Sequence, residues 1–174
     1  MSSTLVKSGR DGRNASALRS GRAAMQTSAG GRLGLIAESF ARLAGRPLVE
    51  PSELGLEAAM WDAPRAIVAH GTEPEPRFYY ANRVALELLG MTATEFIGTI
   101  ARSLAEPVIR EERARLAAGL AQRDIVDIYA VVGIAANGRR FSISSAQVWK
   151  ILDRHGGRHG LGTTFAEWQF LDGS

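Results

Sequence analysis

The feature that most constrains the fold is a long β-hairpin signal in the C-terminal third of the chain. Residues 125–135 (IVDIYAVVGIA) and 139–152 (RRFSISSAQVWKIL) are rich in β-branched and aromatic residues, which favour strands. The pair Asn137-Gly138 between them is the strongest short-range signal for a tight hairpin turn. A further strand signal at 161–170 follows a Gly-rich turn, so this part of the chain predicts a three-stranded antiparallel meander.

A second signal is the run FYYANRVALELLG (78–90), in which a strand changes to a helix at a single residue. Asn82 occupies the N-cap position, where its side-chain oxygen can accept a backbone hydrogen bond, and Gly90 occupies the C-terminal cap position. Thr92 and Glu95 then have the spacing of a capping box, which begins another helix. The sequence therefore predicts a strand followed directly by two short capped helices.

Two short strands and two more helices complete the expected fold. RAIVAH (65–70) and RFYY (77–80) are strand signals on either side of a turn rich in Gly and Pro. A short helix is expected after Pro51, and a longer one over 106–122. This order predicts an α+β fold, with a five-stranded antiparallel sheet and short helices on one face.

An amphipathic helix is expected before these strands. Its apolar face is followed by the helix-ending residues Gly45 and Pro47. This face must be buried, either against its own domain or against a second copy or partner protein. Both alternatives stay open, and the helix is the candidate surface for a homodimer or a partner protein. The residues of this face are Leu33, Ile36, Phe40 and Leu43.

The positive charge of the chain is concentrated at its N-terminus. The net charge is +3 and the pI is near 9.8, although residues after the first 32 are slightly acidic as a group. Residues 1–32 are rich in Ser, Gly, Arg and Ala and have little to bury, so we expect a disordered basic arm. A transit peptide and a weak nucleic-acid-binding tail are the alternative interpretations of this arm.

The composition excludes several classes of site. The chain has no cysteine, which rules out disulfides, thiolate metal sites, cysteine nucleophiles and flavin–cysteine photochemistry. No apolar run approaches the roughly 18 residues that a membrane span needs, and the N-terminus lacks the apolar core of a secretory signal. We expect a cytoplasmic protein, or an organelle protein if residues 1–32 are a transit peptide.

The sequence contains no recognisable catalytic constellation. Gly-x-Ser-x-Gly, a phosphate-binding glycine loop and His-Glu-x-x-His are all absent. The three histidines, His70, His155 and His159, do not have the spacing of a metal site. We therefore expect a protein that is not an enzyme and that has no metal centre.

Four stretches of the sequence resemble a known family. They are AHGTEPEPRFYYANRVALELL (69–89), RSLAEPVIREERARL (102–116), NGRRFSISSAQVWKILDRHG (137–156) and FAEWQF (165–170). The order of segments resembles PAS-type sensor domains, and the stretches themselves resemble the MEKHLA domain, a PAS-related family found in small bacterial proteins and at the C-terminus of plant homeodomain–leucine-zipper transcription factors. The resemblance covers about residues 33–170.

This resemblance implies a PAS-like sensory or protein-interaction fold. It divides the chain into an arm (1–32), an N-terminal helical segment (33–63) and a PAS-like domain (64–172). No homeodomain or zipper is found, so the DNA-binding role of the plant proteins is not carried over. Haem-binding PAS domains usually place a histidine on the long helix, and 106–122 has none, which disfavours haem. The identity of any cofactor is left unknown.

In a PAS-like fold, the sheet and the short helices enclose a cavity that can hold a ligand. Alternation along the strand 139–152 places several side chains on one face, with polar groups in its middle. Alternatively, a β-bulge turns these side chains to the other face of the sheet, or they are simply part of the core. Glu106 and Arg110 lie four residues apart on the expected helix and form either an ion pair or part of the cavity wall. The other ligand-pocket candidates are Tyr80, Phe141, Ser145, Gln147 and Trp149.

The leading hypothesis is a stand-alone PAS-like sensory or regulatory module that acts by small-ligand binding, by protein interaction, or by both. The alternative from another class is a small cavity enzyme, whose candidate ionisable groups are Glu106, Asp127 and Glu167. Association with nucleic acid through residues 1–32 is the third hypothesis.

Overall fold

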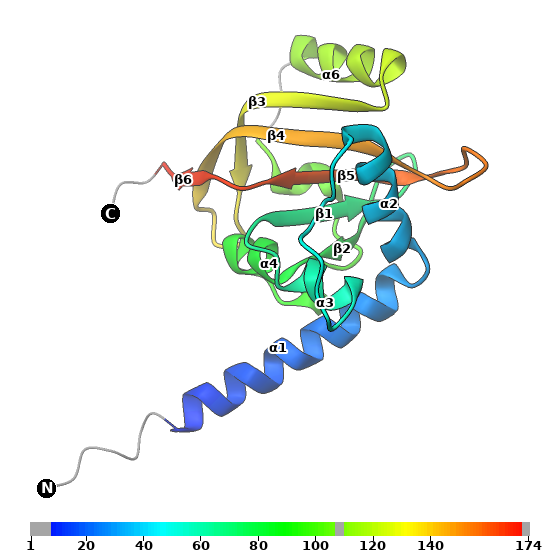
Figure 1. Ribbon diagram of the computed structural model, residues 1–174. Coiled ribbons are helices and arrows are strands. Elements are labelled where there is room, and N and C mark those ends of the chain that lie inside the picture. Colours follow the sequence, from blue (N-terminus) through cyan, green and yellow to red (C-terminus); the bar gives the residue numbers. More distant parts are fainter. Residues whose placement is uncertain (1–7, 107–109, 172–174) are drawn as a thin grey trace, which may run out of the picture.

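The protein is built around one antiparallel sheet, seen in a computed structural model that describes residues 8–106 and 110–171 (Figure 1). Five strands have the spatial order β2-β1-β5-β4-β3, and β6 pairs with β4. The predicted antiparallel sheet is confirmed, with one strand more than expected. The strands are β1 (Ala66–His70), β2 (Phe78–Ala81), β3 (Ile125–Ile134), β4 (Arg140–Leu152), β5 (Arg158–Phe165) and β6 (Trp168–Phe170).

The additional strand arises because the last predicted strand, 161–170, is interrupted. β5 begins earlier than expected and pairs on one side with β1 as far as Phe165, which lies opposite Ala66. The chain then leaves β1 and rejoins β4 through β6, where Phe170 lies opposite Phe141. The strand is broken at Ala166 and Glu167, which belong to neither β5 nor β6.

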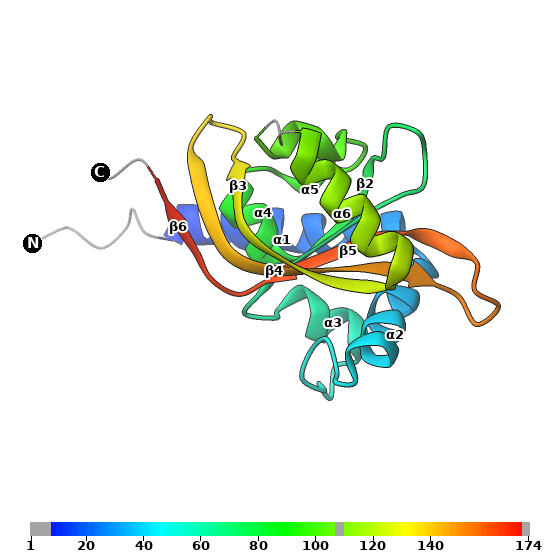
Figure 2. The ribbon, with the colours of Figure 1, turned by 90° about the horizontal axis from the view of Figure 1, so that it is seen from above.

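Helices cover both faces of the sheet. Figure 2 shows α5 and α6 on one side of the curved sheet and α2 and α3 on the other. The prediction of helices on one face therefore holds for α5 and α6, while α2 and α3 cover the opposite face. The helices are α1 (Ser8–Ala29), α2 (Arg32–Ala44), α3 (Leu56–Trp61), α4 (Arg83–Leu89), α5 (Ala93–Phe96), the 3₁₀ helix η1 (Ala101–Leu104) and α6 (Arg110–Gln122).

The predicted caps after β2 are confirmed. The side chain of Asn82 accepts a hydrogen bond from the backbone N–H of Ala85, and Gly90 ends α4 with a left-handed φ of 64°. Thr92 and Glu95 form the reciprocal hydrogen bonds of a capping box at the start of α5. Local side-chain chemistry therefore fixes the corner between β2 and the helices.

The predicted hairpin between β3 and β4 is also confirmed. Gly138 has a φ of 84°, a conformation that favours glycine. The side chain of Asn137 accepts a hydrogen bond from the backbone N–H of Arg139 at 3.0 Å. β3 and β4 then pair from Ile134 and Arg140 back to Ile125 and Trp149, with one interruption at Ala130, whose φ is 55°.

α2 buries its apolar face against its own sheet. Ile36 and Phe40 have no exposed surface, and the ring of Phe40 meets Trp149 edge-on at 4.9 Å. The indole N–H of Trp149 donates to the backbone carbonyl of Ile36 at 3.2 Å. Leu33 and Leu43 are partly buried against the same core. Of the two alternatives left open by the sequence, packing within the domain is the observed one, and this face is not free to bind a partner.

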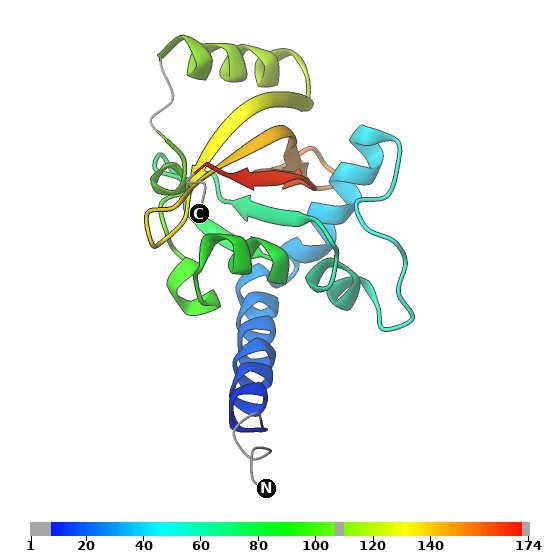
Figure 3. The same ribbon diagram turned by 90° about the vertical axis from the view of Figure 1, so that its left-hand side faces the viewer.

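The expectation of a disordered arm is wrong for residues 8–29, which form α1; residues 1–7 lie outside the described part. Figures 1 and 3 show the N-terminal part of α1 projecting from the domain, while its C-terminal part lies against it. Met25 and Ala29 are buried, and the Ser28 hydroxyl donates to the carbonyl of Tyr79 at 2.7 Å. α1 therefore packs against the edge strand β2, where Ser28 supplies a partner for one backbone carbonyl.

Candidate functional site

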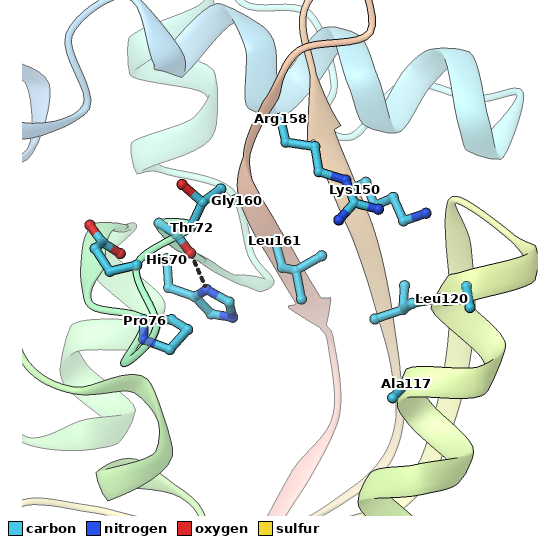
Figure 4. Close-up of a pocket in the computed structure, with 12 residues that line it drawn as sticks. His70, Thr72, Pro76, Ala117, Leu120, Lys150, Arg158, Gly160 and Leu161 are labelled. Carbon is cyan, nitrogen blue, oxygen red and sulfur yellow. Dashed lines mark hydrogen bonds between the residues drawn. The ribbon is translucent and has the colours of Figure 1, made fainter.

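The principal candidate site is a cavity of about 510 Å³ on the face of the sheet that α6 covers. Figure 4 shows His70 and Pro76 on one wall, Ala117 and Leu120 of α6 on the other, and Leu161 of β5 between them. We call this space the α6 cavity. Its volume is within the range of about 300–1,000 Å³ that is typical of small-molecule sites. Its remaining lining residues are Gly71, Thr72, Glu73, Ala121, Lys150, Arg158 and Gly160.

His70 is a half-buried titratable group of this cavity. Burial lowers its pKa, an effect partly opposed by the hydrogen bond to Gly71. The ring nitrogen Nδ1 lies 3.0 Å from the carbonyl oxygen of Gly71, and this oxygen can only accept. Nδ1 therefore carries the hydrogen, and in the neutral ring Nε2 is left as a hydrogen-bond acceptor.

Two cationic side chains and one carboxylate complete the polar part of the α6 cavity. The ammonium group of Lys150 pairs with Asp124 at 3.0 Å, and the lysine side chain is only 11% exposed. Arg158 has no carboxylate within 4 Å in the described part of the chain. The pKa of Glu73 is lowered, mainly by a hydrogen bond from its own backbone. Arg158 is thus the cationic group of this cavity that remains available to a ligand.

Three of the predicted pocket residues belong to the core. Trp149 contacts α2, as described above, and Phe141 packs edge-on against Phe170 with ring centres 6.3 Å apart. Tyr80 is 2% exposed, and burial raises its pKa. Its hydroxyl has no hydrogen-bond partner within the described residues. None of the three lines either of the two cavities described here.

Two other predicted pocket residues, Ser145 and Gln147, line a second cavity of about 400 Å³. This cavity lies on the opposite face of the sheet. Gln147 is two positions before Trp149 and so shares its face, which packs against α2, whereas Lys150 faces the α6 cavity. Ser145 was expected to face an enclosed ligand site and is instead exposed. The alternation of buried and exposed side chains along β4 is interrupted at this point, since Ser144 and Ser145 are both exposed.

The predicted pair of Glu106 and Arg110 is not seen as such. Glu106 forms an ion pair with Arg140 of β4, and it lies just before the segment 107–109. The side chain of Arg110 lies outside the described part of the structure, so its role is untested. Asp127 and Glu167 are exposed. The three carboxylates considered for the enzyme alternative therefore do not converge in the α6 cavity.

Sequence reasoning missed the main residues of the α6 cavity. His70 and Arg158 belong to segments far apart in the chain, and nothing local shows that they meet. Lys150 alone carried a signal, since it interrupts the apolar run VWKIL in a strand (148–152). A lysine in a largely buried strand needs an ionic partner, and this partner is Asp124.

The histidines and the helices give no sign of a metal or a membrane segment. The Nε2 of His159 lies 2.9 Å from the carboxylate of Asp153, and this contact, together with hydrogen bonds from the backbone N–H groups of Gly157 and His155, lowers the pKa of Asp153 to about 2. Residues 8–106 and 110–171 contain no group of three His, Asp or Glu side chains that could hold a metal ion.

None of the helices within these ranges is long and apolar enough to cross a membrane.

Comparison with known families identifies the domain. The MEKHLA domain family matches residues 31–170, which is most of the chain. The chain belongs to the MEKHLA domain family. The resemblance seen in the sequence is therefore confirmed, and the match includes α2 as well as the sheet.

A curated relative is the homeobox-leucine zipper protein REVOLUTA of Arabidopsis thaliana. It is 23% identical over 144 residues, which cover 78% of this chain but only 17% of REVOLUTA. The chain thus spans about one sixth of the length of this relative. The similarity concerns a single portion of a much larger protein.

Solved structures with a similar fold include fungal photoreceptors. A variant of Vivid has a TM-score of 0.53 and 17% identity, with 76% of this chain and 99% of that chain covered. The light-state dimer of Vivid has a TM-score of 0.53, 18% identity and coverage of 76% and 93%. Another fungal LOV-domain photoreceptor has a TM-score of 0.51, 20% identity and coverage of 74% and 88%. These similarities establish the PAS-like fold of this MEKHLA domain.

Proposed function

We propose that this MEKHLA domain is a sensory or regulatory module, without catalytic activity, that responds to a small molecule bound in the α6 cavity. The observation that carries the proposal is the cavity of about 510 Å³ between α6 and the sheet. It combines an apolar wall from α6 and β5 with a few polar groups, which is the usual composition of ligand pockets.

The lining of the cavity favours a ligand with an apolar body and one polar or acidic end. Ala117, Leu120 and Leu161 offer apolar contacts, while Arg158 offers donors and His70 offers an acceptor at Nε2. Light sensing through a cysteinyl–flavin adduct is not part of the proposal, because the chain has no cysteine. Sensing would instead depend on the concentration of the bound molecule.

α6 is the element whose position is expected to change when a ligand binds. The helix lies close to β3 at Gly119, since a Cβ there would lie 3.3 Å from Cγ1 of Val126. Most other side chains of α6 are exposed or only partly buried. A helix with so little buried surface can shift on ligand binding at low cost in free energy.

Native mass spectrometry of the freshly purified full-length protein tests the proposal. We expect a stoichiometric additional mass that is lost on denaturation, and we expect Ala117→Trp to abolish it by filling the cavity. Ala118→Trp is the matched control, because Ala118 is also exposed on α6 but does not line the cavity. A bound mass that persists in Ala117→Trp, or no bound mass in any preparation and no uptake of added small molecules, would contradict the proposal.

A further inference from the structure

The second cavity, on the α2 side of the sheet, is lined by two arginines. It has a volume of about 400 Å³. Arg46 comes from the loop after α2, and Arg65 immediately precedes β1. We call this space the arginine cavity. Its other lining residues are Asp127, Ser145, Ala146, Gln147, Thr164, Phe165, Ala166 and Glu167.

The sheet register holds the two arginines next to each other. The Nε–H of Arg65 donates to the hydroxyl of Thr164 at 2.7 Å, and an Nη2–H of Arg46 donates to Oε1 of Gln147 at 2.6 Å. Gln147 and Thr164 are direct partners across β4 and β5. Thr164 is fully buried and its hydroxyl donates to the carbonyl of Ala66 at 2.9 Å. The acceptor of Arg65 is therefore fixed, and the guanidinium is positioned before any ligand arrives.

Neither guanidinium group forms a direct ion pair within the described part of the chain. Neither Arg46 nor Arg65 has a carboxylate within 4 Å among residues 8–106 and 110–171. Partial burial lowers the pKa of Arg65, and the positive charge of Arg46 lowers it further. Arg65 is half-buried, whereas Arg46 is exposed at the mouth of the cavity. The two like charges repel each other, and a bound anion would relieve this repulsion.

We propose that the arginine cavity binds the carboxylate group of a small polar molecule between Arg46 and Arg65. Guanidinium groups present parallel N–H donors that match the two oxygens of a carboxylate. The exposed hydroxyl of Ser145 lies in the same cavity and supplies a further donor. This ligand is distinct from the one in the α6 cavity, and the inference does not depend on the proposed function.

The acidic residues of the cavity favour a ligand with a single negative charge. Asp127 and Glu167 also line it, and both are exposed. They would repel the second negative charge of a phosphate dianion, and they can accept hydrogen bonds from an amino group. The cavity therefore suits simple carboxylates and amino acids better than phosphate.

The test is an NMR titration of the full-length protein that follows the side-chain Nε–H signals of its arginines. The probes are acetate, glycine and inorganic phosphate. We expect saturable shifts at Arg46 and Arg65 with both carboxylates, and weaker binding of phosphate. Tighter binding of glycine than of acetate would support a role for the acidic residues. Phosphate binding as tight as that of the carboxylates, or no saturable shift with either carboxylate, would overturn the proposal.

Variants separate a site from a general attraction of anions to a basic protein. Arg46→Gln and Arg65→Gln should each weaken carboxylate binding about tenfold or more, as expected for loss of a charged hydrogen bond. Arg154→Gln, at an exposed arginine of the β4–β5 turn, should leave the carboxylate affinity unchanged.

Ser145→Glu tests the same site if Arg65→Gln does not fold, because Ser145 is exposed and its replacement should not disturb folding. It places a carboxylate in the cavity and should weaken binding about tenfold. Equal affinities in all four variants would overturn the proposal.

Discussion

At the scale of single residues, Asn82 connects three elements of the fold. Its Oδ1 accepts from the backbone N–H groups of Ile67 and Ala85 at 3.0 and 3.2 Å. Its Nδ2 donates to the carbonyls of Met60 and Arg65 at 3.1 and 2.7 Å. Only the bond to Ala85 could be predicted from the sequence, because it is local. The other partners lie 15 to 22 residues away and are brought together by the fold.

Replacement of Asn82 should therefore be severely destabilising. Asn82→Ala leaves two buried N–H groups and two carbonyls without their partner, and we expect a loss of about 3 kcal/mol or more in the free energy of unfolding. Asn137→Ala is the control, since Asn137 makes one exposed hydrogen bond in the hairpin turn and should cost about 1 kcal/mol or less. Urea denaturation measures both, and similar losses in the two variants would show that Asn82 is only a helix cap.

His70 should make the stability of the protein depend on pH. Its pKa is lowered by burial, so below its ordinary value of about 6.5 the unfolded chain takes up a proton before the folded protein does. Stability is therefore lost as the pH falls through 6.5, until the folded histidine also becomes protonated. Above this range both states hold a neutral ring, and His70 contributes no pH dependence.

The measurement is the free energy of unfolding at about pH 7.5 and about pH 5.5. The wild type should lose more stability between the two values than His70→Gln does. His155→Gln, at an exposed histidine, should behave as the wild type. An unchanged pH dependence in His70→Gln would mean that this ring is not buried in its neutral form.

At the scale of elements, α2 could be predicted and α1 could not. The apolar residues of α2 recur with helical spacing, whereas α1 (SGRDGRNASALRSGRAAMQTSA) has no such pattern. α1 is held by specific contacts along its C-terminal part. Arg22 pairs with Glu57 of α3 at 2.8 Å, and the Ser28 hydroxyl donates to the carbonyl of Tyr79 at 2.7 Å. Such contacts depend on tertiary neighbours, and the sequence of α1 alone does not reveal them.

A substitution at Met25 tests whether α1 is docked in solution. Met25 is 1% exposed, so Met25→Ala should lower the free energy of unfolding by about 2–3 kcal/mol. Gln26→Ala changes the exposed neighbour on the same helix and should stay within about 0.5 kcal/mol of the wild type. If residues 8–29 were a disordered arm, the two variants would be equally stable.

At the scale of the whole molecule, the order of strands and helices was sufficient to predict the fold, while the site was not predictable. Hydrophobic patterns and turn residues such as Gly138 are local, and they determine the succession of elements. The α6 cavity instead depends on how far α6 stands from the turn after β1. Its key residues, His70 and Arg158, come from separate strands and carry no shared pattern. Ser145 and Gln147, predicted for the ligand pocket, line the arginine cavity on the opposite face of the sheet from the α6 cavity.

The central claim is that a small molecule enters the α6 cavity. The most direct measurement is a fragment screen by NMR on the full-length protein, with the backbone amide shifts mapped onto the structure. The account predicts that apolar acids shift the amides of 70–73, 117–121 and 161 together, and that Ala117→Trp removes these shifts while Ala118→Trp retains them. The account would be contradicted if no fragment shifted the amides of these segments, or if the shifts persisted in Ala117→Trp.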